Sequence, residues 1–241
     1  ALAPGFRPYD ERRTMLRRFY GRQLSRLQNK LLSLASMVER ALLDSVEYLQ
    51  RRDLEGALRL IAGDARINAL RYDLEDDALA LIATQQPMAG DLRNTAAILH
   101  IGTELERIGD YAKGICRIVL WLGKKTVIQD FPQIAAMATK SASMLRRSID
   151  AFVREDIGLA KSIAAEDDEV DALYNAVSRE LMTAVMARPA ALEQVNQLLW
   201  VAHNLERSAD RVTNICERVV FTVTGELREL DVEDGILAQR C

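Results

Sequence analysis

The sequence predicts an all-α protein built from two tandem, sequence-related, antiparallel three-helix bundles, with six long helices in all. The main indication is an internal repeat: residues 105–110 read Leu-Glu-Arg-Ile-Gly-Asp, and residues 205–210 read Leu-Glu-Arg-Ser-Ala-Asp. Six of sixteen positions agree between 101–116 and 201–216, and both stretches end in Ile-Cys. An internal repeat indicates repeated structural units even before any single helix is assigned. The duplication therefore favours two related units within the 241 residues.

Composition and apolar spacing point to the same fold. The chain is 49% hydrophobic but only 5% aromatic, with 12 glycines and 5 prolines, which is typical of long helices. Apolar and small residues recur at alternating steps of three and four, the spacing of a buried helical face. They are Leu105, Ile108, Ala112, Ile115, Val119 and Leu122 in the first copy, and Leu205, Ser208, Val212, Ile215, Val219 and Thr222 in the second. Short connections between long helices predict antiparallel neighbours.

Three helices are expected in the first half, at about residues 14–50, 54–84 and 89–122. Residues 1–13 carry two prolines and a glycine among charges and are expected to form a flexible lead-in. Asp53 is a natural N-cap for the second helix, because its carboxylate can accept from the free amides of the first turn. Pro87 breaks the chain before the third helix, and Gly123 ends that helix because glycine readily takes the left-handed conformation.

The second half repeats this plan, with helices expected at about residues 132–153, 157–187 and 190–224. An offset of 103 residues aligns Asp156 with Asp53 and Asp167 with Asp64. The offset falls to 100 after the loop that contains Pro87 in the first half and Pro189 in the second. The first copy therefore holds three extra residues in its loop, where insertions are tolerated. The chain divides into a lead-in at 1–13, a first bundle at 14–127, a second bundle at 128–224 and a C-terminal tail at 225–241.

Charge and cysteine content exclude several classes of protein. A net charge of −3 and a pI near 5.6 argue against nucleic-acid binding, which needs a basic surface. The apolar runs are far shorter than the roughly 20 residues that span a bilayer, so membrane contact is expected only peripherally, through partners. The three cysteines give no disulfide framework, and Cys116, next to the apolar position Ile115, is expected to be buried. With no secretory signal in view, a cytoplasmic location is expected.

Each half carries two pairs of oxygen-bearing side chains, and the members of a pair are four residues apart on a predicted helix. This spacing places both side chains on one helix face. The pairs are Asp64 with Asn68 and Glu106 with Asp110 in the first half, and Asp167 with Asp171 and Glu206 with Asp210 in the second. If the two pairs of a half converge on one groove, their oxygens suit hard cations such as Mg²⁺, Mn²⁺, Ca²⁺ or iron.

The same residues also fit a simpler structural role. A Glu-x-x-x-Asp pair is common on a solvated helix face, and Glu106 and Asp110 lie beside the apolar face rather than on it. The arginine that follows each glutamate can form an exposed ion pair with the aspartate three residues on. A purely structural helical scaffold is therefore an alternative. A carboxylate-bridged metalloenzyme is less well supported, because neither His100 nor His203 follows a glutamate by three residues.

Three stretches of the sequence carry a resemblance to a known family. Residues 85–93 read Gln-Gln-Pro-Met-Ala-Gly-Asp-Leu-Arg, and the repeated segments at 105–110 and 205–210 follow. Over about residues 15–224 the chain resembles the PhoU family of phosphate-signalling proteins, which are two tandem three-helix bundles whose Glu/Asp-x-x-x-Asp motifs bind clusters of metal ions, often iron. It departs from the family pattern at Ser208-Ala209, where Ile-Gly is usual, and at Asn68, which weakens one carboxylate pair.

The resemblance implies two metal sites and a regulatory role. Asp64, Asn68, Glu106 and Asp110 would form one site, and Asp167, Asp171, Glu206 and Asp210 the other, with iron as the expected metal and Mg, Mn, Zn or Ca as alternatives. The protein would be a non-enzymatic negative regulator that represses the phosphate-starvation response at high phosphate. It would link the ATPase subunit of the phosphate ABC transporter to the sensor histidine kinase of the phosphate two-component system. A homodimer is expected from the common symmetry of oligomers.

Overall fold

The computed structural model describes residues 8–124 and 132–230, with side chains from Phe19 onward, and these residues form helices and no strands. The first half holds α1 (Pro8–Arg51), α2 (Leu54–Gln85) and α3 (Gly90–Leu122). The second holds α4 (Pro132–Arg154), α5 (Ile157–Ala164), α6 (Asp167–Ala187), the short 3-10 helix η1 (Pro189–Ala191) and α7 (Leu192–Thr224). Each half is a three-helix bundle, as the repeat predicted.

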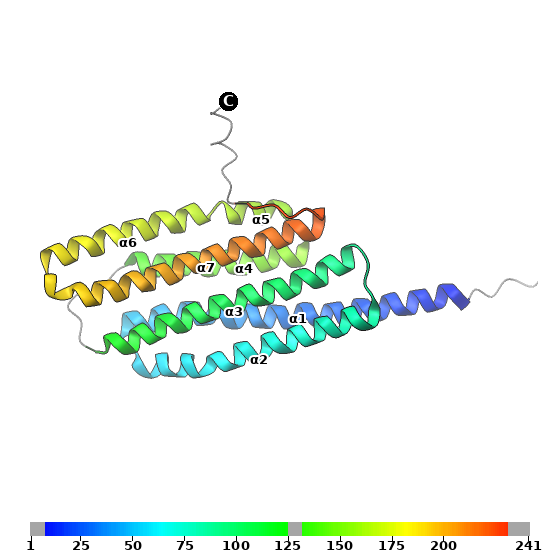
Figure 1. Ribbon diagram of the computed structural model, residues 1–241, viewed down its shortest axis with the longest axis horizontal. Helices are drawn as coiled ribbons and strands as arrows, with labels where there is room; N and C mark the ends of the chain where they lie inside the picture. Colours follow the sequence, from blue (N-terminus) through cyan, green and yellow to red (C-terminus); the bar gives the residue numbers. More distant parts are fainter. Residues whose placement is uncertain (1–7, 125–131, 231–241) are drawn as a thin grey trace, which may run out of the picture.

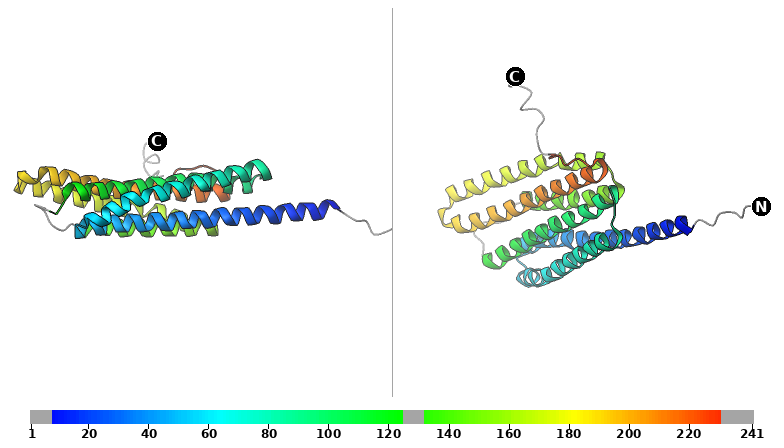
Figure 2. Two further views of the ribbon diagram at one scale, coloured as in Figure 1. Left: turned by 90° about the horizontal axis from the view of Figure 1, so that it is seen from below. Right: turned by 45° about the vertical axis from the view of Figure 1, so that its right-hand side comes forward.

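The helices form two layers (Figures 1 and 2). In one layer α2, α3, α7 and α6 lie side by side, and α1 and α4 lie together in the other. The most extensive helix contact joins α3 to α7 and so joins the two halves, and α1 also packs on α4. The two bundles therefore share one continuous apolar core. None of the described helices is long and apolar enough to cross a membrane.

Most predicted helix boundaries are confirmed by their caps. Asp53 Oδ1 accepts from the backbone N–H of Gly56 at 2.8 Å, and Asp156 Oδ1 accepts from that of Leu159 at 2.9 Å. Gly123 ends α3 in the left-handed region, with φ of 61°. The first helix begins at Pro8, earlier than the predicted start at residue 14, because proline is well suited to the first helical position. The predicted domain boundary at 127/128, the rest of the lead-in (1–7) and most of the tail (231–241) lie outside the described residues.

The fifth predicted helix is interrupted, which the sequence reading missed. Residues 165 and 166 form a turn between α5 and α6. Glu166 is drawn to α4, where Arg147 donates to it at 2.7 Å and Lys140 lies 2.8 Å away. The next three residues are Asp-Asp-Glu, and such acidic side chains favour a helix N-terminus. A new helix start at Asp167 is therefore stabilised electrostatically.

The predicted core positions of α3 and α7 are all buried, including the polar Ser208 and Thr222. Cys116 is also buried, as predicted, and burial raises the pKa of its thiol to about 12. Its repeat counterpart, Cys216, is buried as well. Both described thiols thus act as small core hydrophobes.

An approximate two-fold axis between α3 and α7 relates the two halves. Asn214 donates to Glu104 at 3.3 Å, while a side chain at Gly114 would lie 3.2 Å from Nδ2 of Asn204. The repeat offset of 100 pairs Glu104 with Asn204 and Gly114 with Asn214, so the two contacts exchange places. The helices are antiparallel, and the axis runs through both layers. Corresponding surfaces of the two halves therefore open on the same broad side of the molecule.

Matched packing pairs explain why the second half tolerates alanine where glycine is usual. A Cβ on Gly109 would lie 3.4 Å from Ile67, and one on Gly102 would lie 3.0 Å from a methyl group of Leu74. The corresponding pairs in the second half are Ala209 with Val170 and Ala202 with Val177, all fully buried. In both pairs, the α6 side chain of the second half has one carbon fewer than its α2 counterpart in the first half. The α7 residue of the second half has one carbon more than its α3 counterpart. The space filled is conserved although the residues differ.

Candidate functional site

The first-half acidic site lies between α2 and α3 and consists of Asp64, Asn68, Glu106 and Asp110. Asp64 is almost fully buried, with 6% of its side chain exposed. The ammonium of Lys113, on α3, lies 2.5 Å from Oδ2 of Asp64 and 3.5 Å from Oδ1 of Asp110. Asn68 donates to the same Asp64 oxygen at 3.2 Å, and its own Oδ1 is buried without a hydrogen bond. A positive charge thus already sits at the centre of this site.

The pKa shifts of these groups follow from their closeness to one another. Burial raises the pKa of Glu106, and the negative charges of Asp110 and Asp64 raise it further against the opposing effect of nearby arginines. The hydrogen bond to Asp64 raises the pKa of Lys113 despite partial desolvation. Lys113 is therefore held in its charged form by the carboxylates around it.

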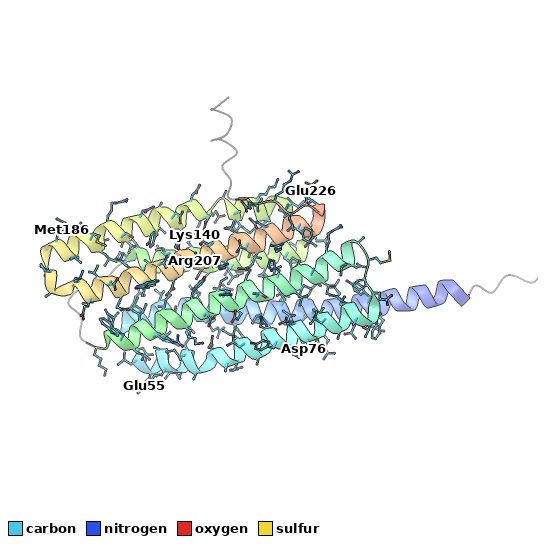
Figure 3. The ribbon with its side chains drawn as sticks, in the orientation of Figure 1. Glu55, Asp76, Lys140, Met186, Arg207 and Glu226 are labelled. Carbon is cyan, nitrogen blue, oxygen red and sulfur yellow. The ribbon has the colours of Figure 1, made fainter. Side chains whose placement is uncertain are left out.

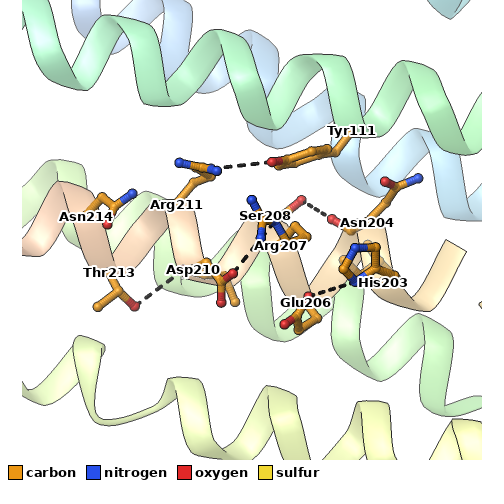
Figure 4. A network of polar contacts seen from close by, with 12 residues as sticks. Tyr111, His203, Asn204, Glu206, Arg207, Ser208, Asp210, Arg211, Thr213 and Asn214 are labelled. Carbon is orange, nitrogen blue, oxygen red and sulfur yellow. Dashed lines mark hydrogen bonds and ion pairs between the residues drawn. The ribbon is translucent and has the colours of Figure 1, made fainter. Parts of the chain in front are cut away.

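The second-half acidic site lies between α6 and α7 and consists of Asp167, Asp171, Glu206 and Asp210. Glu206 and Asp210 project from the side of α7 away from Tyr111 of α3 (Figure 4). Oε2 of Glu206 lies 3.2 Å from Nδ1 of His203, although the alignment is not that of a hydrogen bond and this buried oxygen has no hydrogen-bond partner. Arg207, near the middle of α7 (Figure 3), reaches Asp210 only at 3.9 Å.

Charges of neighbouring carboxylates contribute to the raised pKa values of Glu206 and Asp210. Burial raises the pKa of Glu206, and the charges of Asp210 and Asp171 add to that effect. Burial also raises the pKa of Asp210, where Asp171 again adds to the effect while Arg207 opposes it. Asp171, whose pKa is raised by burial and by Asp168, therefore faces both α7 carboxylates across the helix pair. Asp167 lies one turn earlier on α6, at the first residue of that helix.

Two functional candidates were missed by the sequence reading, namely Lys113 and His203. Each has a visible signal at helical spacing: Lys113 follows Asp110 by three residues, and His203 precedes Glu206 by three. The His203 ring is positioned edge-on to Trp200, with ring centroids 5.5 Å apart. His203 precedes its glutamate instead of following it as in diiron bundles, and Lys113 acts as a counter-ion rather than as a ligand.

The two sites differ in how well they fit a metal ion. Among the described side chains, those of residues 19–124 and 132–230, no group of three or more His, Cys, Asp or Glu is placed so as to hold a metal ion. The second-half site nevertheless offers mutually repelling, partly buried carboxylates, an imidazole and an unsatisfied oxygen, a donor set suited to a divalent cation. The first-half site does not fit, because the Lys113 ammonium already neutralises its buried carboxylate.

Comparison with known proteins gives consistent matches over nearly the whole described chain. A family model described as the PhoU domain matches twice, at residues 31–119 and 134–219. The phosphate-specific transport system accessory protein PhoU homolog of Clostridium acetobutylicum is 34% identical over 221 residues, 91% of this chain and all of that protein. The accessory protein PhoU of Escherichia coli is 33% identical, covering 86% of each chain.

Solved structures agree with these matches. The crystal structure of the phosphate transport system regulatory protein PhoU from Streptococcus pneumoniae superposes with a TM-score of 0.81 at 32% identity, covering 87% of this chain and 99% of that one. PhoU from Pseudomonas aeruginosa gives the same TM-score at 30% identity, covering 86% of this chain and all of that one. The predicted fold is thereby confirmed. The names of these relatives describe accessory and regulatory proteins rather than enzymes, in agreement with the non-enzymatic expectation.

Proposed function

The chain belongs to the PhoU family, and from that premise we propose that it is an accessory protein of phosphate transport that represses the phosphate-starvation response when phosphate is plentiful. It does so as a cytoplasmic adaptor between the ATPase subunit of the phosphate ABC transporter and the sensor histidine kinase of the phosphate two-component system. The observation that carries this proposal is the match over the full length of a relative named as a phosphate-specific transport accessory protein. Both repeats also match the PhoU domain model, at residues 31–119 and 134–219.

A metal ion at the second-half acidic site is the chemical part of the proposal, with iron as the first candidate. Support comes from donor chemistry: the charges of Asp171 and Asp210 raise the pKa of Glu206, the charge of Asp171 raises that of Asp210, and a divalent cation would relieve this repulsion. Metal bound here would stabilise the α6–α7 pair and would hold the surrounding surface in one state. The net charge of that surface would then depend on whether metal is bound.

The regulatory part is tested by deleting the gene and measuring transcription of phosphate-starvation genes in high and low phosphate. We expect expression in the deletion strain to stay high when phosphate is plentiful, and the wild-type gene to restore repression. Purified protein should also retain the transporter ATPase subunit and the kinase in a pull-down. Normal repression in the deletion strain would contradict the proposal.

The metal part needs a separate measurement. The variant Asp171→Asn with Asp210→Asn removes two negative charges from the second-half site and nearly preserves shape. Elemental analysis of protein purified from its own host should find metal in the wild type and much less in this variant. Asp76→Asn with Asp150→Asn, two exposed aspartates elsewhere, is the matched control and should retain the metal. Equal metal content in wild type and double variant would exclude this site.

A further inference from the structure

We propose that Lys113 serves as a built-in cation that takes the place of a metal ion in the first half, so that the two halves neutralise their matching acidic sites in different ways. The inference rests on the proposed metal only for the second half. What it adds is that the first half needs no metal and excludes one while Lys113 is present. The chain would thus carry one site that depends on metal supply and one that does not.

The contacts of Asp64 support this assignment. Its Oδ2 receives the Lys113 ammonium at 2.5 Å and the Asn68 amide at 3.2 Å, so the oxygen's two lone pairs are already engaged. Lys113 also reaches Asp110 at 3.5 Å and thereby bridges a carboxylate of α2 to one of α3. A hard cation would need these same oxygens and would lie within a few ångströms of a fixed positive charge. The two cations therefore compete for one position.

The repeat provides a second, independent observation. At the position matching Lys113 the second half has Thr213, a buried neutral residue whose hydroxyl lies 3.5 Å from the backbone oxygen of Ala209. At the position matching Asn68 it has Asp171. Both differences make the first half less negative, and they occur on different helices. Four carboxylates without a lysine in one half thus correspond to three carboxylates with a lysine in the other.

The test transplants the second-half pattern into the first half and uses Mn²⁺ as the probe. The background is Asp171→Asn with Asp210→Asn, so that any remaining binding comes from the first half. Onto it are added Lys113→Thr and Asn68→Asp, each the residue found at the matching position. Electron paramagnetic resonance of free Mn²⁺ then reports how much is bound.

We expect the background protein to show no Mn²⁺ binding at the concentrations tested. The transplanted protein should bind with a Kd at least about tenfold below the highest of those concentrations, because a repelling charge is lost and a carboxylate is gained. The matched control is Lys30→Thr in the same background. Lys30 is as buried as Lys113 and is likewise paired with two aspartates, Asp73 and Asp77, but at the α1–α2 contact. This control should bind no Mn²⁺.

Four results decide between the proposals. First-half binding in the background protein that is lost on Asp64→Asn would overturn the inference, as would a folded transplanted protein that does not bind. Absence of Mn²⁺ from the wild type would count against the second-half metal site but would leave the background-to-transplant comparison intact. If the transplanted protein does not fold, Lys113→Thr alone replaces it. In that same background we expect its Tm in chelator to be about 5 °C below that of the background protein and to recover with Mn²⁺, and no recovery would overturn the inference.

Discussion

The two halves of this protein have the same arrangement of helices, but different residues surround the carboxylates of their acidic sites. In the first half a lysine of α3 lies on the buried Asp64, whereas in the second half Asp171, Glu206 and Asp210 face one another with only loosely placed cationic neighbours. The same contrast of equal shape and different residues recurs in the core, where Leu74 and Gly102 correspond to Val177 and Ala202. The fold therefore requires a certain total side-chain volume in the core and charged groups at the acidic sites, but different residues can supply them.

The largest expected effect concerns whether the two halves unfold together or independently. Leu105 and Leu205 are matching, fully buried residues, and replacing either with alanine should cost about 3 kcal/mol in free energy of unfolding. Because α3 and α7 form the largest helix contact, each substitution should destabilise both halves. Hydrogen exchange measured by mass spectrometry should show faster exchange in α2 and in α6 for either variant. Protection lost only in the substituted half would contradict the single shared core.

A smaller effect is expected when the Leu74–Gly102 packing pair of the first half is replaced by the residues of the second half. Gly102→Ala places a carbon about 3.0 Å from Leu74, and overpacking of this kind costs about 1–3 kcal/mol, offset in part by alanine's helix propensity. Leu74→Val alone leaves a small cavity. The double variant copies the second half and should be more stable than the two single effects predict. Urea unfolding of all four proteins measures this coupling, and strict additivity would refute the matched-pair explanation.

The contact between the halves offers a smaller test. Glu104 is buried and accepts from Asn214 at 3.3 Å, with Arg211 at 3.5 Å, whereas its counterpart Asn204 lies beside Gly114. Glu104→Ala leaves Arg211 with less compensation and should cost about 1–2 kcal/mol in free energy of unfolding. Asn204→Ala should cost clearly less, about 0.5 kcal/mol. Equal losses in urea titrations would mean that the α3–α7 contact is more symmetric than its residues suggest.

The smallest effect concerns pH. Glu166 matches Gly63 of the first half, so its ion pairs exist in the second half alone. Burial favours its neutral form, but hydrogen bonds from Lys140 and Arg147 outweigh that effect and lower its pKa from 4.5. A lowered carboxyl pKa stabilises the fold above the unfolded pKa, and the stabilisation is lost as pH falls below 4.5 through the folded value.

Glu166→Gln should therefore be less stable than wild type at pH 7, by about 1 kcal/mol, and the difference should vanish in acid. Unfolding curves across this pH range measure it. Glu169→Gln, at an exposed glutamate that also contacts Lys140, is the control and should change little. A constant deficit for Glu166→Gln at every pH would point to lost packing rather than to charge.

Local chemistry made most of the fold readable from the sequence. Asp53 and Asp156 mark helix starts, Gly123 marks an end, and the seven-residue apolar spacing identifies the core. The turn at residues 165 and 166 escaped because it depends on Lys140 and Arg147, which are distant in sequence. In the site, helical spacing located the acidic residues, but which cation each pair faces depends on how neighbouring helices rotate against each other. Spacing within one helix carries no such information.

The two-fold relation between α3 and α7 has a consequence for how such a molecule can evolve. Two identical polypeptides meeting about this axis would each have to carry the same residue at every position, so a lysine beside one acidic groove would appear beside both. Joining the copies in one gene removes that obligation. One acidic site can then have a lysine beside it while its counterpart has a neutral threonine, a difference that a symmetric pair of identical subunits cannot have.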